Sequence, residues 1–267
     1  MSPAIVGIVL VRNEDVFVEQ AIRNVAEFCD QIHAFDHVST DRTWGILRRL
    51  AREYPHLEAS RTHHADESHA LVEGYAGTNT WIFGVDGDEV YDPVRLAGFR
   101  GELLSGARGD VFKVASNVVN CIEFDRERLT ASGYPSPPSR SITKLYNFAA
   151  IESWAGDGSE RLHGGTIVFR NGYGENSVDN IGEHMSWDET PLRCLHLCFV
   201  RRSSRDQDAT VRPILMESGM HDRSWRGAVK RRLLGRRPPA EGVWKREKYM
   251  RGEVVTVDAS PFFHPAR

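Results

Sequence analysis

The residues best suited to chemistry are three acids that directly follow a short apolar run. Trp81–Val85 is typical of a buried strand, and Asp86, Gly87, Asp88 and Glu89 come straight after it. Neighbouring carboxylates raise the cost of ionising one another, and a divalent cation removes that cost. Oxygen ligands of this kind suit Mg²⁺ or Mn²⁺. The segment predicts a metal or nucleotide site, and the alternative is an ordinary Asp-Gly turn.

An alternation of strands and helices precedes these acids. The expected strands are Ile5–Val11, Gln31–Phe35, Leu57–Arg61 and Thr80–Val85, and the expected helices cover 18–29, 47–54 and 67–77. The helices are indicated by apolar residues at helical spacing. Short connections between such elements favour a parallel sheet covered on both faces. Ligands of open α/β sheets bind beyond the carboxyl ends of the strands, which is where the acids would lie.

Beyond Asp92-Pro93 the pattern changes to longer strands, and we expect no regular helices between them. These strands are Val111–Phe124, Ser141–Phe148, Thr166–Arg170 and Leu192–Val200, with a loop over Ser132–Ser139 that is rich in proline and glycine. They predict a mixed sheet that forms the second wall of a cleft. We divide the chain into a nucleotide-binding half (1–92), an acceptor-side half of the same domain (93–205) and a basic C-terminal extension (206–267).

Composition excludes several classes of protein. The chain has 267 residues, of which 40% are hydrophobic and 27% charged, as in soluble globular proteins. A net charge of −3 argues against a general nucleic-acid binder. No apolar run approaches the ~18 residues of a membrane span, and the N-terminus is typical of a first strand rather than a signal peptide. Four scattered cysteines fit a reducing compartment, so we expect a cytoplasmic protein.

The segment 223–251 is strongly basic. Its basic residues are Arg223, Arg226, Lys230, Arg231, Arg232, Arg236, Arg237, Lys245, Arg246, Lys248 and Arg251, opposed only by Glu241 and Glu247. One interpretation is a solvated helical tail. The others are attraction to a pyrophosphate or an anionic acceptor, and peripheral contact with an anionic membrane.

Three segments resemble a known family. They read Val9-Leu-Val-Arg-Asn-Glu-Asp, Phe35-Asp-His-Val-Ser-Thr-Asp-Arg-Thr and Val85-Asp-Gly-Asp-Glu. In this order and spacing they are similar to the nucleotide-binding half of GT-A glycosyltransferases, in particular family 2, whose motifs read V-x-N-E, V-D-D-G-S-T-D-x-T and D-x-D. His37 and Val38 depart from the second motif. The resemblance spans residues 5–90 and implies a Rossmann-like α/β GT-A fold. That fold has a mostly parallel central sheet with helices on both faces, and a mixed acceptor-side sheet.

The resemblance implies transfer of a sugar from a nucleoside-diphosphate sugar to a hydroxyl acceptor, whether a glycan, a lipid-linked compound or a small molecule. Mn²⁺ or Mg²⁺ would neutralise the departing diphosphate. The implied metal ligands are Asp88, Asp86 and His196. For His196 the alternative is a hydrogen-bonded core histidine. The implied nucleotide-binding residues are Val11, Arg12, Asn13, Glu14, Asp36, Asp86 and Gly87. Asp36 would contact the base or ribose, or else cap the turn after its strand, and a side chain at Gly87 would crowd the ligand.

An inverting transfer needs a base that takes the proton of the acceptor hydroxyl. Glu160 is our first candidate, with Asp157 and His163 beside it, although Gly156-Asp157-Gly158 also fits a simple turn. A retaining mechanism needs no such base, and the sequence leaves the stereochemistry open.

Two other functions compete with this interpretation. A sugar-1-phosphate nucleotidyltransferase would carry a glycine-rich basic loop after its first strand, and residues 12–16 lack one. A non-catalytic nucleotide- or carbohydrate-binding protein could keep the cleft without the chemistry.

Overall fold

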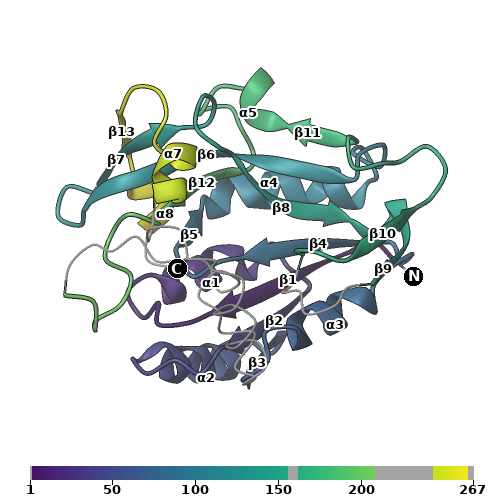
Figure 1. Ribbon diagram of the computed structural model, residues 1–267, viewed down its shortest axis with the longest axis horizontal. Helices are drawn as coiled ribbons and strands as arrows, with labels where there is room; N and C mark the ends of the chain where they lie inside the picture. Colours follow the sequence, from purple (N-terminus) through teal and green to yellow (C-terminus); the bar gives the residue numbers. More distant parts are fainter. Residues whose placement is uncertain (1, 156–161, 208–242, 264–267) are drawn as a thin grey trace, which may run out of the picture.

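The acids lie at the carboxyl ends of the parallel strands of the sheet. The structure is a computed structural model that describes residues 2–155, 162–207 and 243–263. The parallel strands are β1 (Ala4–Val11), β2 (Gln31–Asp36), β3 (Leu57–Arg61) and β4 (Thr80–Val85). They lie side by side in the order β3-β2-β1-β4 (Figure 1). Val11 pairs with Asp36 and Val9 with Val85, so the carboxyl ends of β1, β2 and β4 meet at one edge.

Burial explains why β1 and β4 are central. Every residue of β4 is buried, and β1 is buried from Ile5 to Val11. Apolar runs of this kind suit strands covered on both faces, which is typical of parallel sheets. The bounds of β3 and β4 match the sequence predictions, and β1 begins one residue earlier than expected.

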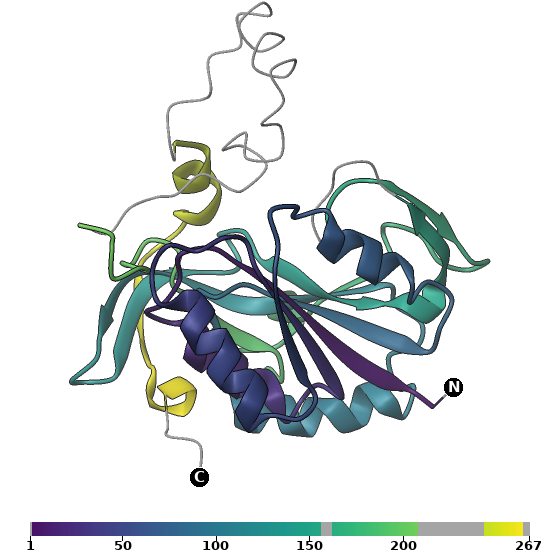
Figure 2. The same ribbon diagram turned by 90° about the horizontal axis from the view of Figure 1, so that it is seen from below.

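Helices cover both faces of this sheet, as the sequence predicted. Figure 2 shows three helices along one face, namely α1 (Val18–Ala26), α2 (Thr43–Glu53) and α4 (Pro93–Leu104). The other face carries α3 (Glu67–Glu73), the short 3-10 helix η1 (Phe148–Ala150) and a two-stranded ribbon of β9 (Ile151–Ala155) and β10 (Thr166–Phe169). In α1 the buried residues Val18, Ile22 and Val25 follow the apolar stripe that predicted the helix.

The expectation that the second half lacks regular helices is wrong at α4. Asp92 caps this helix, and its side chain accepts hydrogen bonds from the backbone N–H groups of Val94 (3.0 Å) and Arg95 (3.2 Å). Pro93 occupies the first turn, where its missing N–H costs nothing. The pair Asp92-Pro93 is therefore a helix start rather than only a boundary between patterns.

The strands that follow β4 in the chain extend the sheet by both antiparallel and parallel pairing. They are β5 (Glu89–Tyr91), β6 (Lys113–Asp125), β7 (Thr130–Pro135), β8 (Ile142–Asn147), β11 (Val178–Asn180), β12 (Arg193–His196) and β13 (Val255–Asp258). Within the described residues they complete an 11-stranded sheet, in which β8 pairs antiparallel with β4 and β6 lies beyond β8. The expected mixed pairing is confirmed, but these strands continue the central sheet, and the second wall of a cleft stays a prediction. The loop predicted over Ser132–Ser139 is wrong in its first part, because β7 runs to Pro135.

The described part of the C-terminal extension packs on this sheet. It contains α7 (Val243–Tyr249), β13 and α8 (Ser260–Phe263), and the short α5 (Ile181–His184) lies earlier in the chain. Asn24 of α1 donates a hydrogen bond to the carbonyl oxygen of Phe262 (2.8 Å), whose own side chain is fully buried. Residues 208–242 lie outside the described residues, and they include most of the basic segment 223–251. No helix in the described part of the chain is long and apolar enough to cross a membrane.

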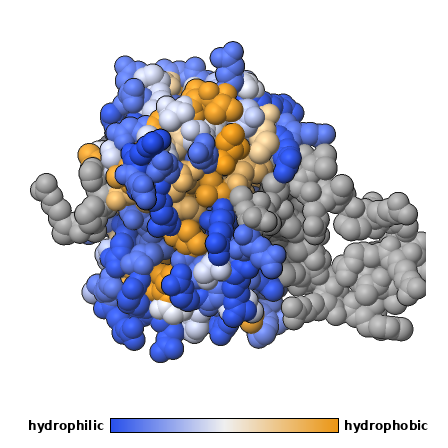
Figure 3. Space-filling model, turned by 90° about the vertical axis from the view of Figure 1, so that its left-hand side faces the viewer, coloured by the Kyte–Doolittle hydropathy of each residue, from blue (hydrophilic) through white to orange (hydrophobic). Residues whose placement is uncertain are grey.

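Apolar side chains gather on the side of the molecule where β7 and β13 form the edge of the sheet. Figure 3 shows this area bordered by hydrophilic surface. Ile122 and Val254, which flank the ladder joining Cys121, Gly133 and Val255, are 37% and 47% exposed. The C-terminal edge strand thus brings apolar surface to this side.

Candidate functional site

The predicted acids lie at the carboxyl edge of the parallel strands. Asp86 and Asp88 occupy the turn between β4 and β5, and Glu89 begins β5. The ladder between β5 and β12 places His196 directly opposite Glu89, and the backbone N–H of Leu197 donates to the carbonyl oxygen of Asp88 at 2.8 Å (Figure 1). The structure therefore gathers all of the predicted metal ligands into one region.

Asp88 belongs to a buried ion-pair group that we call the inner clamp, made of Asp88, Arg202 and Glu14. The Arg202 Nη1 lies 2.5 Å from Asp88 Oδ2 and 3.5 Å from Glu14 Oε1. The side chains of Asp88, Arg202 and Glu14 are only 4%, 7% and 12% exposed. Burial lowers the pKa of the Arg202 guanidinium, but the charges of Asp88 and Glu14 outweigh burial and raise that pKa above its usual range.

Asp86 belongs to a second group, the outer clamp, made of Asp86, Lys144 and Glu89. The Lys144 Nζ lies 2.6 Å from Asp86 Oδ2 and 3.3 Å from Glu89 Oε1. Lys144 and Glu89 are 10% and 1% exposed, whereas the Asp86 side chain is 27% exposed. Asp86 is thus the acid of the turn that solvent and solutes reach most easily.

A neighbouring strand delivers Lys144. Lys144 lies on β8, which pairs antiparallel with β4. A Cβ at Gly84 on β4 would make ordinary contact with Lys144 Cδ at 3.7 Å but would lie 3.0 Å from Leu162 Cδ1, so the glycine makes room for Leu162 beside the lysine stem. Sequence reasoning missed Lys144 as a site residue. The available signal was a lysine among apolar residues in a strand, where only a paired lysine is buried.

A loop far along the chain delivers Arg202. Its carbonyl oxygen accepts from the Val16 N–H (3.1 Å), the Ser203 hydroxyl donates to Asp41 Oδ2 (2.6 Å), and the Ser204 N–H donates to Asp15 Oδ1 (2.6 Å). These bonds tie residues 202–204 to the segments that follow β1 and β2. Arg202 is 114 residues from Asp88 in the sequence, and no local pattern indicated their contact.

Gly87 has a packing role. A Cβ at this position would lie 2.3 Å from Glu14 Oε2 and 3.0 Å from Val11 Cγ1. Such a distance to the Glu14 carboxylate is far inside van der Waals contact, so the β4–β5 turn can lie against the end of β1 only with glycine there. The sequence suggested crowding of a ligand, whereas the structure shows crowding of the inner clamp.

The other predicted nucleotide-binding residues fix the loops at this edge. Asn13 Oδ1 accepts from the Thr40 N–H at 2.7 Å, which ties the end of β1 to the loop after β2. Asp36 is fully buried, accepts from the Ser39 N–H and lies 3.0 Å from Arg61 Nε. Burial raises the pKa of Asp36 and outweighs the lowering by Ser39 and Arg61. Asp36 therefore caps the turn, and its contact with a nucleotide stays a prediction.

Val11 and Arg12 end β1 at the same edge. Val11 is 1% exposed and belongs to the core, whereas Arg12 is half-buried. Of these two, Arg12 is the residue whose side chain is within reach of a solute.

His196 is held by a side chain from β6. Its Nδ1 lies 2.8 Å from Asn120 Oδ1, and the Asn120 amide donates to the Ser139 hydroxyl at 2.8 Å. The amide orientation makes Asn120 Oδ1 the acceptor, so His196 Nδ1 is the donor in this hydrogen bond. The ring of Tyr249 from α7 meets the His196 ring edge-on at 5.3 Å. Burial raises the pKa of the Tyr249 phenol to about 12, against the opposing charges of Arg140 and Lys144.

Of the three residues predicted as candidate bases, only one is described. Asp157 and Glu160, two of the three base candidates, lie outside the described residues. The third, His163, is exposed. Leu162, immediately before it, is buried, and its Cδ1 lies 3.0 Å from where a Gly84 Cβ would be, two residues before Asp86. The chain after the undescribed segment thus returns to β4 close to the acids.

Asp86 is the described side chain that best fits a share in a divalent-cation site. Among the described residues, no group of three histidine, cysteine or acidic side chains is arranged to hold a metal ion. Mg²⁺ is usually held by one or two carboxylates together with substrate phosphates. Asp86, partly exposed and supplying hard oxygen ligands, fits a cation of that kind, shared with a bound diphosphate.

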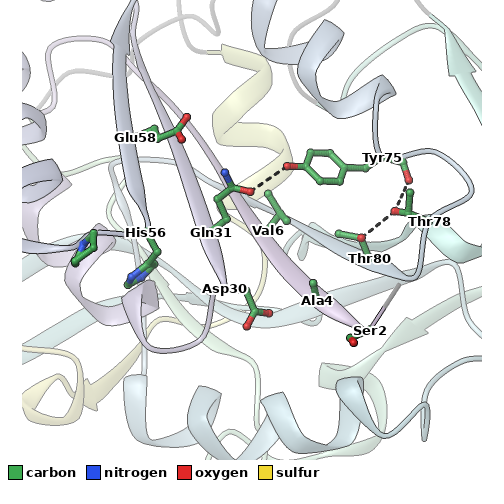
Figure 4. Close-up of a pocket in the computed structure, with 11 residues that line it drawn as sticks. Ser2, Ala4, Val6, Asp30, Gln31, His56, Glu58, Tyr75, Thr78 and Thr80 are labelled. Atoms are coloured by element: carbon green, nitrogen blue, oxygen red, sulfur yellow. Dashed lines mark hydrogen bonds between the residues drawn. The ribbon is translucent and has the colours of Figure 1, made fainter.

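A separate pocket of about 410 Å³ lies at the amino ends of the parallel strands, opposite to the acids (Figure 4). Its lining includes Ala4, Gln31 and Thr80, the first residues of β1, β2 and β4. Tyr75 donates to Gln31 Oε1 across it at 3.4 Å. None of the predicted site residues lines this pocket, which is therefore distinct from the carboxyl-edge site.

Comparison with known proteins gives only distant similarity. The sequence matches no protein-family model and no curated protein. Solved structures similar to this chain include TarS from S. aureus (residues 1–349), with a TM-score of 0.39, 17% identity and coverage of 55% of this chain and 48% of TarS. Another is the mannosyltransferase PcManGT from Pyrobaculum calidifontis in complex with GDP-Man and Mn²⁺, with a TM-score of 0.33, 24% identity and coverage of 43% and 36%.

A third similar structure is mannose-6-phosphate isomerase from Helicobacter pylori, with a TM-score of 0.33, 11% identity and coverage of 54% of this chain and 60% of that one. The chain spans less than two thirds of each of these proteins. Similarity at this level carries no argument about activity, which must come from the site itself.

Proposed function

We propose that the chain is a glycosyltransferase that moves a sugar from a nucleoside-diphosphate sugar to a hydroxyl-bearing acceptor. The observation that supports it most is the position of Asp86 and Asp88 at the edge where β1, β2 and β4 end together. This edge is where open α/β sheets bind nucleotides. The segments resembling the GT-A motifs also meet here, and Lys144 and Arg202 bring positive charge for a diphosphate.

The protein groups have distinct parts in this proposal. Asp86, with the diphosphate oxygens, would hold Mn²⁺ or Mg²⁺, and such a cation neutralises the charge that develops on the leaving diphosphate. The inner clamp keeps the β4–β5 turn in place, so that Asp86 meets the donor from a fixed backbone. Asp88 and His196, the other ligands that the resemblance implies, are buried, and Asp88 is already paired with Arg202.

On the acceptor side we propose an inverting transfer. The acceptor hydroxyl attacks the anomeric carbon, the bond to the diphosphate breaks, and a base takes the hydroxyl proton. Glu160 is the proposed base, with Asp157 and His163 as its alternatives. The acceptor class, the cytoplasmic location and the membrane contact through 223–251 stay predictions.

The first test combines ligand binding with one substitution. Thermal unfolding with UDP and GDP, with and without Mn²⁺, should show a rise in melting temperature, because a ligand that binds only the folded state stabilises it. Asp86→Asn should lower the rate of transfer from a panel of nucleotide sugars by about 100-fold or more, as expected when a group that stabilises transition-state charge is lost.

Asp188→Asn is the matched control, because the Asp188 side chain is 90% exposed and lies outside the clamps. It should transfer sugar at the wild-type rate. If no nucleoside diphosphate stabilises the wild-type protein, or if Asp86→Asn retains full activity, the proposed function is wrong.

A further inference from the structure

The outer clamp puts a protein cation on the carboxylate that would hold a divalent ion. Lys144 Nζ contacts Asp86 Oδ2 at 2.6 Å, which is the distance of a charge-assisted hydrogen bond. An ammonium and a divalent cation repel each other at such separations, so they cannot occupy the same carboxylate oxygen together. Either the ion binds elsewhere, or Lys144 moves when the ion arrives.

We propose that Lys144 is the resident cation of the diphosphate site: it occupies Asp86 in the donor-free protein and transfers its ammonium to a phosphate oxygen when the donor binds. This inference rests on the proposed function, because it needs a diphosphate at this edge. Divalent ions and Lys144 then compete for Asp86 in the absence of donor. When the donor is present, Lys144 would contact a phosphate oxygen, and Asp86 would be left for the divalent ion.

The surroundings of Lys144 allow this exchange. A lysine ammonium sits on a flexible four-carbon stem with rotatable donors, and the Asp86 side chain that it contacts is 27% exposed. When Lys144 moves, Glu89 keeps its other partners, since its Oε2 accepts from the Asp86 N–H at 3.3 Å and from the Tyr91 hydroxyl at 3.5 Å. Departure of the ammonium therefore does not leave the buried Glu89 carboxylate without hydrogen bonds.

The inner clamp cannot make the same exchange. Arg202 is 7% exposed and its guanidinium contacts both Asp88 and Glu14. Its loop is fastened to the segment between β1 and α1 by a hydrogen bond from the Val16 N–H to the Arg202 carbonyl oxygen. Movement of Arg202 would leave two buried carboxylates without their cation, which is costly. Only the outer clamp combines a flexible cation with a partly exposed acid.

The test measures Mn²⁺ binding to the donor-free full chain by isothermal titration calorimetry. Lys144→Met and Lys144→Gln should each bind Mn²⁺ about tenfold or more tightly than the wild-type protein, because the competing charge is gone. Arg100→Met is the control, since Arg100 pairs with Asp30 before β2, at the other edge of the sheet. It should bind Mn²⁺ like the wild type. Equal or weaker Mn²⁺ binding by the Lys144 variants overturns the proposal.

A second measurement uses the wild-type protein alone, so the test does not depend on the variants folding. UDP or GDP should tighten Mn²⁺ binding by about tenfold or more, as reciprocal coupling requires when the diphosphate removes Lys144 from Asp86. A lack of coupling overturns the exchange. If neither nucleotide binds, the proposed function fails, and the Mn²⁺ comparison between Lys144→Gln and wild type still decides whether Lys144 competes for Asp86.

Discussion

The inner and outer clamps use the same chemistry in different surroundings. Each places one basic side chain between two carboxylates. Each also includes one aspartate of the turn that follows β4. They differ in exposure, since Asp88 is 4% exposed and Asp86 is 27% exposed. They also differ in the cation, because Arg202 is a planar fork that suits fixed ion pairs and Lys144 is a flexible point charge. The comparison separates a structural ion pair from one that can be exchanged.

The D-x-D pattern alone does not make this distinction. The resemblance implies Asp88 as the first choice of direct metal ligand and Asp86 as a contact of the ribose or the metal. In the structure Asp88 has a buried guanidinium partner, and Asp86 faces the more open side. Burial raises the free-energy cost of exchanging a partner, so we expect Asp86, the more exposed acid, to be the one that binds a solute.

The largest effect should follow from breaking the inner clamp. Arg202→Met leaves Asp88 and Glu14 buried without their cation, and we expect the free energy of unfolding to fall by about 3 to 5 kcal/mol. Urea denaturation followed by circular dichroism measures this change. Lys144→Met should cost clearly less, because Asp86 is partly exposed and Glu89 keeps other hydrogen bonds.

The control for Arg202 lies in the same loop. Arg205 is exposed, and Arg205→Met should change stability by no more than about 0.5 kcal/mol. If Lys144→Met proves as destabilising as Arg202→Met, the two clamps are both structural and the distinction between them is wrong.

Protonation of Asp15 at low pH should weaken the hydrogen bonds that hold the loop carrying Arg202. Burial raises the pKa of Asp15, but hydrogen bonds from Ser204 and Arg42 outweigh burial and lower that pKa from 3.8 to about 2. A lowered pKa in the folded state stabilises the protein above the unfolded value, and the contribution is lost as the pH falls from about 4 to about 2. Asp15→Asn should remove about 2 kcal/mol of stability at neutral pH and flatten the loss over that window.

A graded variant checks the cause. Ser204→Ala removes the hydroxyl donor to Asp15 Oδ2 but keeps the Ser204 N–H bond to Oδ1, both 2.6 Å long. It should lower stability by less than Asp15→Asn, when unfolding is measured from pH 2 to pH 7. An unchanged acid profile in Asp15→Asn would mean that this carboxylate does not hold the Arg202 loop.

The sequence predicted the parallel half well because its signals are local. The apolar run of β4 and the helical spacing in α1 are each read within one element. Helix α4 carried a local signal too, in Asp92-Pro93, which we read as a boundary between patterns. The predicted elements were therefore largely right for strands buried on both faces and for helices with one apolar stripe.

The site was less predictable because its cations come from distant segments. Lys144 is 58 residues from Asp86 and Arg202 is 114 residues from Asp88. Their contacts depend on β8 pairing beside β4 and on a loop fastened by hydrogen bonds, and neither feature has a pattern within a short window. The acids could be found from the sequence, whereas their state of pairing could not.

The smallest effect concerns Val38, in the loop after β2 that packs beside both Asn13 and Asp36. Val38 has a φ of 52°, a left-handed conformation that is unfavourable for a β-branched residue, and the resembling motif has glycine here. Val38→Gly removes a penalty of about 1–2 kcal/mol and adds about 0.5–1 kcal/mol of chain entropy cost. We expect a net gain of up to about 1 kcal/mol by urea denaturation.

Val38→Ala separates strain from side-chain size. Alanine keeps the Cβ that disfavours positive φ, so it should gain less than glycine. Hydrogen bonds next to Val38 join Ser39 and Thr40 to Asn13, which belongs to neither clamp, so neither variant should change the Mn²⁺ competition at Asp86. A Val38→Gly protein less stable than Val38→Ala would show that the loop does not adopt the left-handed turn. The positions of Asn13 and Asp36 at the edge of the site would then need another support.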